Sequence, residues 1–201
     1  MIRPALRGPV PLVVVVALLA AMLQPVSAAA AGAEAFVRKV GDDVVDVLRQ
    51  TPAGSEQREK RLRHLFVSVF DAPTIAKFVM GRHWRRLTDE QRERYLKVFP
   101  GYVAAIYARQ FSDYKGQTFH VVRYRSTDGQ TVVSTEIRGG GLNQPINLEI
   151  RVRPTDGGFK IIDVKVEGIS LLVTKRDEFN TFLARNDVAT LIDRLAKIAK
   201  S

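Results

Sequence analysis

The spacing of apolar residues changes at Gly116, and this change constrains the fold more than any other feature of the chain. Before Gly116, apolar residues recur every three or four positions, which is the period of an amphipathic helix. After it, apolar and polar residues alternate, as they do in strands with one buried face. A helical half followed by a strand half is typical of an α+β fold, in which helices gather on one face of an antiparallel sheet.

The helical half is expected over residues 34–115. Thr88 and Gln91 form a capping box, in which each side chain satisfies a backbone N–H of the other residue at the start of a helix. Pro100 followed by Gly101 is expected to kink or split the long helix that contains them, because proline removes a backbone hydrogen bond. The pattern predicts four helices, over residues 34–49, 55–70, 71–81 and 88–114.

The strand half is expected over residues 118–168, followed by two helices within residues 171–200. Thr-Asp-Gly sequences at Thr127 and Thr155 indicate hairpin turns. Ile146, Leu148, Ile150 and Val152 alternate strictly with polar residues, so one face of the sheet is expected to be covered and the other wet. The pattern predicts a curved antiparallel sheet of four strands, over residues 119–125, 131–138, 146–153 and 159–167.

The first 28 residues have the order of a secretory signal peptide. Arg3 and Arg7 precede an apolar run over residues 10–23, and small residues follow it. A membrane-spanning helix needs about 20 apolar residues, and this run is shorter. Cleavage after Ala28 or Ala30 is therefore expected rather than membrane anchoring, and residues 29–201 should form one soluble, exported domain.

The composition excludes several classes of function. The chain has no cysteine, so disulfides, thiol catalysis and cysteine-ligated metals are excluded. The net charge is +10, and loss of the leader would lower it to about +8. Such a charge suits nucleic acid, anionic headgroups or an acidic partner. Nucleic acid is not expected, because the chain is exported and its basic residues alternate with acidic ones, as in residues 56–61.

The polar residues form no recognisable catalytic or metal-binding motif. His64, His83 and His120 lie far apart without ligand spacing, and neither a metal nor a cofactor is expected. Asp163 and Glu167 occupy the wet face of a predicted strand, so they are expected to be surface ions rather than an acid–base pair. The three glycines at 139–141 indicate a hairpin loop rather than a phosphate cradle.

The space between the sheet and the helices has two interpretations. The apolar residues either fill a core or line a pocket, and the periodicity by itself favours a filled core. A pocket would hold lipid tails without covalent chemistry, because burying each methylene contributes about 0.8 kcal/mol.

Several segments resemble the MlaC family. Residues 70–91 are similar to its helix-corner signature and residues 162–171 to its second signature, with Arg176–Phe179 following at the expected place. An aromatic stretch at 102–107, with Phe111 and Tyr114 after it, adds to the likeness. The similarity extends from about residue 36 to residue 195, and the same pattern includes toluene-tolerance proteins and the hopanoid-associated HpnM relatives.

The resemblance implies a periplasmic carrier that belongs to an ABC transport system for outer-membrane lipid asymmetry. Such a carrier takes phospholipid between an outer-membrane lipoprotein complex and an inner-membrane ABC transporter complex, and it is not an enzyme. Acyl chains would occupy a lipid-sized cavity between the curved sheet and the helices. The family often has an aromatic residue in the fourth strand, where Phe159 and Ile161 stand here. Pro100 and Gly101 interrupt a helix that is commonly continuous, and both departures affect the shape of the cavity.

On this interpretation, one set of apolar residues is expected to contact the lipid. Two other classes of protein remain open: an enzyme with Tyr102, His83 or Asp163 as catalytic residues, and an interaction module with a filled core. A carrier of hopanoid or another apolar small molecule is the alternative within the same class. The candidate lipid-binding residues are Phe78, Val79, Trp84, Tyr102, Val103, Ile106, Ile146, Leu148, Ile150, Val164, Val166, Ile169, Leu171 and Leu172.

Overall fold

The computed structural model describes residues 25–111 and 114–200. The α-helices of this part are α2 (Pro25–Gln50), α3 (Glu56–Val69), α4 (Ala72–Met80), α5 (Asp89–Ala108), α6 (Leu171–Leu183) and α7 (Val188–Lys200). Two short 3-10 helices are η1 (Gly81–Arg86) and η2 (Arg109–Phe111). The strands are β1 (Thr118–Thr127), β2 (Gln130–Arg138), β3 (Ile146–Thr155), β4 (Gly158–Val166) and β5 (Ile169–Ser170).

The strands form one antiparallel meander in the order β1-β2-β3-β4-β5. The predicted α+β class is confirmed, but the predicted count of four strands is wrong. Glu167 and Gly168 have φ angles of 48° and 81°, and positive φ at both central residues is the geometry of a tight two-residue hairpin turn. The chain therefore reverses after β4, and β5 pairs with the end of that strand.

The predicted starts of α3 and α5 agree with the capping contacts. The Ser55 hydroxyl accepts a hydrogen bond from the backbone N–H of Arg58 at 3.2 Å, as an N-cap residue does. Gln91 donates its backbone N–H to the Thr88 hydroxyl at 3.2 Å, and Thr88 donates its own to the Gln91 side chain at 3.1 Å. These caps depend on residues three apart, which is why the sequence reveals them.

Two helix boundaries differ from the prediction. Helix α2 begins at Pro25 rather than near residue 34, so both expected cleavage positions lie within it, whereas residues 1–24 of the predicted leader lie outside the described residues. Helix α5 passes through Pro100 without being split, and it ends at Ala108 rather than near Tyr114. Gly101 packs so closely against α7 that an added Cβ would lie 3.2 Å from Ala199, and this packing supports α5 beside the proline.

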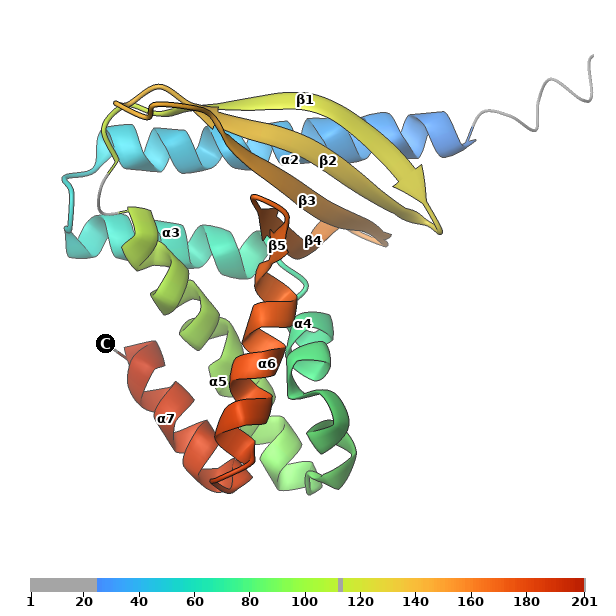
Figure 1. Ribbon diagram of the computed structural model, residues 1–201, viewed down its shortest axis with the longest axis vertical. Coiled ribbons are helices and arrows are strands. Elements are labelled where there is room, and N and C mark those ends of the chain that lie inside the picture. The colour runs from blue at the N-terminus through green and yellow to red at the C-terminus, as the bar shows by residue number, and fades with distance from the viewer. Residues whose placement is uncertain (1–24, 112–113, 201) are drawn as a thin grey trace, which may run out of the picture.

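The helices do not all cover the sheet. Figure 1 shows α2 lying along one face of the sheet beneath β1 and β2, while α4 to α7 gather at the other end of the molecule. One core joins α2 to the sheet, through Val37, Val133 and Val152. A second core lies inside the helical bundle and contains Tyr95 and Phe99. The sheet and the bundle thus each have an apolar core of their own.

The free edge of β4 links the bundle to the sheet. Phe70 forms a parallel bridge with Ile161, and the backbone N–H of Asp71 donates to the Ile161 carbonyl at 2.9 Å. The Asp71 side chain caps α4 by accepting from the N–H of Thr74 at 3.2 Å, and it also pairs with Arg153 of β3. The α3–α4 junction is therefore fixed to β3 and β4.

Within residues 25–111 and 114–200, no helix combines the length and the apolarity that crossing a membrane requires.

Candidate functional site

An apolar cavity of about 480 Å³ lies between the sheet and the helices. Its volume is within the range of roughly 300–1,000 Å³ in which proteins bind small ligands. The wall is formed by α2, the sheet and the helices α3, α4, α5 and α6, together with η2 and neighbouring loop residues. The described structure therefore has an open apolar space where periodicity favoured a filled core.

The sheet wall of the cavity follows the alternation of β3. Ile146, Leu148 and Ile150 all line it. Leu148 lies opposite Val166 and Ile150 opposite Val164, so β4 continues the same apolar rows. Alternate residues of a strand share a face, and the spacing of two seen in the sequence is what brings these side chains together.

A β-bulge in β4 adds a residue that alternation does not foresee. Ile161 pairs with Val152 and Asp163 pairs with Arg151, so Ile162 is the extra residue between them. Ile161, Ile162 and Asp163 all line the cavity, and each is buried. The prediction that Asp163 is a surface ion is therefore wrong, because the bulge and the start of α6 remove its side chain from solvent.

Asp163 fixes the start of α6. Its carboxylate accepts hydrogen bonds from the Ser170 hydroxyl at 2.8 and 3.0 Å and from the Leu172 N–H at 3.3 Å. Ser170 also caps α6 by accepting from the backbone N–H of Val173 at 3.1 Å. Leu171 and Leu172 line the cavity, so these bonds hold one end of its wall in place.

The other polar residues of the wall are mostly uncharged. Tyr107 lines the cavity, and burial raises its pKa, with Tyr102, Glu178 and Asp163 adding to the rise. The tyrosine thus stays protonated near neutral pH. Asp163 and Lys175 are the charged residues among the described lining residues. A wall with so few charges suits the non-reacting, apolar part of a ligand.

Nine of the fourteen candidate residues line the cavity, while their contact with lipid stays a prediction. They come from α4, α5, β3, β4 and α6, which tertiary folding brings to one space. They are Val79, Val103, Ile146, Leu148, Ile150, Val164, Val166, Leu171 and Leu172.

The structure places the other five candidates away from the cavity. Tyr102 is buried among the aromatic side chains of the bundle core, where Ile106 also packs. Trp84 lies in η1 against the ring of Tyr95, with their centroids 6.4 Å apart. Phe78 is exposed beneath the Arg176 guanidinium, and Ile169 is 65% exposed on the β4–β5 hairpin. The sequence identified these as apolar positions but not the neighbour that each one faces.

The expected lipid-binding residues include none from α2, although this helix lines much of the site. This helix places two consecutive valines, Val44 and Val45, on the cavity wall, so its apolar surface is wider than the stripe needed to pack on a sheet. The two adjacent valines were the sequence signal that could have indicated a second apolar contact of this helix. The lining residues of α2 are Val37, Val40, Gly41, Val44, Val45 and Leu48.

The residues of the alternative catalytic site do not gather at the cavity. Tyr102 and His83 do not line it, and only Asp163 does. Burial raises the pKa of Tyr102 to about 12, and the Glu178 carboxylate adds to the rise. Burial lowers the pKa of His83, helped by Arg82 and Arg86. No group of three potential metal-ligating side chains occurs in the part of the chain that the structure describes.

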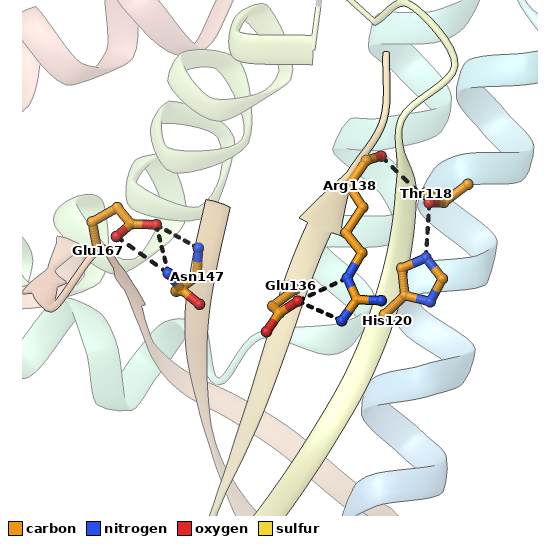
Figure 2. A network of polar contacts seen from close by, with 6 residues as sticks. All are labelled: Thr118, His120, Glu136, Arg138, Asn147 and Glu167. Atoms are coloured by element: carbon orange, nitrogen blue, oxygen red, sulfur yellow. Dashed lines mark hydrogen bonds and ion pairs between the residues drawn. The ribbon is translucent and has the colours of Figure 1, made fainter. Parts of the chain in front are cut away.

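The opposite face of the sheet is polar, as predicted. Figure 2 shows Glu136 paired with Arg138, with 2.7 Å between the charged groups. At the edge of the sheet, His120 is bonded at 2.8 Å to the hydroxyl of Thr118, a residue that also lines the cavity. The Glu167 carboxylate accepts from the side-chain amide of Asn147 at 3.2 Å as well as from its backbone N–H. Glu167 therefore secures the hairpin turn between β4 and β5.

Comparisons with known proteins agree with this geometry. The family model described as MlaC protein matches residues 38–197. A phospholipid-binding protein from Ralstonia solanacearum, solved in complex with a phospholipid, has a similar fold with a TM-score of 0.71. The two sequences are 24% identical, and the match covers 83% of this chain and 96% of the other.

Proposed function

This chain belongs to the MlaC family, and from that premise we propose that it carries phospholipid and is not an enzyme. The observation that carries the proposal is the apolar cavity of about 480 Å³ between the sheet and the helices. The similar protein from Ralstonia solanacearum was solved with a phospholipid, which supports the same class of ligand here.

The energetics of the cavity favour acyl chains. Each buried methylene contributes about 0.8 kcal/mol, so a chain of many methylenes is held firmly by burial alone. Ile146, Leu148 and Val166 offer aliphatic contacts along the sheet, and Val44 and Val45 offer them from α2. The zwitterionic or charged headgroup of a phospholipid stays near water, because burying an unpaired charge is costly.

The proposed setting is the periplasm. The signal-peptide pattern of the first 28 residues and membership of the MlaC family support export. There the protein would take phospholipid between an outer-membrane lipoprotein complex and an inner-membrane ABC transporter complex. After loss of the leader, a net charge of about +8 would draw it to acidic partner surfaces.

The test is to identify what the protein holds when it is purified from the periplasm. Native mass spectrometry of the mature chain should show a bound species with the mass of a phospholipid, and organic extraction should release it. A hopanoid mass would reassign the cargo. An empty protein that also extracts no lipid from vesicles would contradict the proposed function.

A further inference from the structure

Lys175 is the one positively charged side chain among the described residues that line the cavity. Its side chain is 20% exposed, so it reaches both the apolar wall and the solvent. It follows Leu171 by four positions on α6, which places the two residues on the same face of the helix. Lys175 thus marks one place where the cavity meets water.

The buried carboxylate of the wall does not neutralise this lysine. Asp163 uses its oxygens to accept from Ser170 and from the N–H of Leu172. In the described part of the chain, the ion pair of Lys175 is with Glu178, at 2.6 Å from Nζ to Oε2. Glu178 is half exposed and three residues away, and such surface pairs are weak.

The ammonium has capacity for a further acceptor. A lysine carries three N–H donors, and the bond to Glu178 uses one of them. Glu178 therefore holds the Lys175 ammonium at the edge of the cavity and leaves two of the three N–H donors of the lysine for other acceptors. An anionic oxygen placed beside the mouth would accept a charge-assisted hydrogen bond from Lys175.

We propose that Lys175 binds the phosphate of the lipid headgroup while the acyl chains occupy the cavity, an inference that rests on the proposed carrier function. Glu178 acts as a positioning residue that orients the ammonium. The cavity would then select lipids that carry a phosphodiester next to their acyl chains over neutral lipids with the same chains.

The experiment compares two lysine variants of the delipidated mature protein. Lys175→Met removes the charge but keeps an unbranched apolar side chain. Lys165→Met is the control, because Lys165 does not line the cavity and pairs with Glu149 at 3.5 Å on the sheet. Uptake is measured for two probes with identical fluorescent acyl chains, a phosphatidylglycerol and a diacylglycerol, each presented on a cyclodextrin without any other lipid.

Lys175→Met should weaken binding of the phosphatidylglycerol about tenfold, the scale of a partly exposed charge-assisted hydrogen bond, and leave diacylglycerol binding unchanged. Lys165→Met should change neither. The inference would be overturned if Lys175→Met bound the phosphatidylglycerol as tightly as the wild type does. So would an equal loss of both probes, since that result indicates damage to the cavity.

Inorganic phosphate distinguishes the source of the anion. Competition by free phosphate in the wild type but not in Lys175→Met would show that the ammonium binds phosphate without a lipid. Absence of competition, together with the loss of phosphatidylglycerol, would assign the site to the intact headgroup. Failure of the wild type to bind either lipid would instead contradict the carrier function itself.

Discussion

Gly41 of α2 lies so close to Phe119 of β1 that a Cβ on the glycine would be 2.1 Å from the phenyl ring. Both residues line the cavity, and Gly41 is buried. The absence of a side chain lets the helix approach the sheet at this point. Val44 and Val45, which follow Gly41 on the same helix, line the open part of the cavity. The close approach therefore sets the height of the cavity at one end.

Gly41→Ala should destabilise the protein even though alanine favours helices. The change would add about 1 kcal/mol of helix propensity, but the clash with Phe119 should cost about 1–3 kcal/mol and displace the ring. Urea unfolding would measure the net loss, and lipid uptake should fall because the displaced ring enters the cavity. Gly157→Ala is the control, since nothing lies within 4 Å of its added Cβ; equal stability of the two variants would contradict the packing described.

A charge on the cavity wall should remove the cargo. Leu148→Glu places a carboxylate among Ile150, Val164 and Val166, where acyl chains would have to desolvate it. We expect native mass spectrometry to show at least a tenfold loss of co-purified lipid, with circular dichroism unchanged. Val173→Glu, at a site that is 47% exposed and does not line the cavity, should retain the lipid. Lipid retention by Leu148→Glu would show that the cargo binds elsewhere.

Arg58→Met should be strongly destabilising. Arg58 is 6% exposed, and its guanidinium donates to the Leu48 carbonyl at 2.7 Å, to the Thr51 hydroxyl at 3.1 Å and to the Phe111 carbonyl at 3.4 Å. It ties the end of α2 to α3 and η2, and its removal leaves buried carbonyls without donors. The expected loss is about 2–4 kcal/mol by urea unfolding. Arg61→Met, on the exposed side of α3, should change stability by less than about 0.5 kcal/mol.

The Asp71–Arg153 pair should make stability depend on acid pH. Burial opposes ionisation of Asp71, but hydrogen bonds from Thr74 and the Arg153 guanidinium outweigh it and lower the pKa below the ordinary 3.8. Because the folded-state pKa is lowered, the contribution of Asp71 is complete above the unfolded-state pKa and is lost as pH falls through the folded-state pKa.

The test compares wild type with Asp71→Asn by urea unfolding from pH 7 to pH 2. Wild type should be more stable by about 1–3 kcal/mol at pH 5 and above, and the difference should shrink below about pH 4. A difference that stays constant down to pH 2 would show that ionisation of Asp71 does not contribute.

The sequence by itself determined where the main helices and the four long strands lie, but not the short strand β5. The helix caps at Ser55 and Thr88 depend on residues three apart. The face of β3 that lines the cavity depends on the alternation of apolar and polar residues along the strand. Both are local relationships, so a single chain reveals them. The family signatures likewise lie in short stretches, which is why membership of the MlaC family could be expected before the fold was known.

Only the tertiary structure decided that the space between the layers is a cavity. That space depends on the distance between α2 and the sheet, which Gly41 and Phe119 set although they lie 78 positions apart in the numbering. The bulge at Ile162 turned Asp163 inward, and the bundle core took Tyr102 away from the site. Periodicity states which side of an element is apolar, but it carries no information on what that side faces, because the facing residues come from distant parts of the chain.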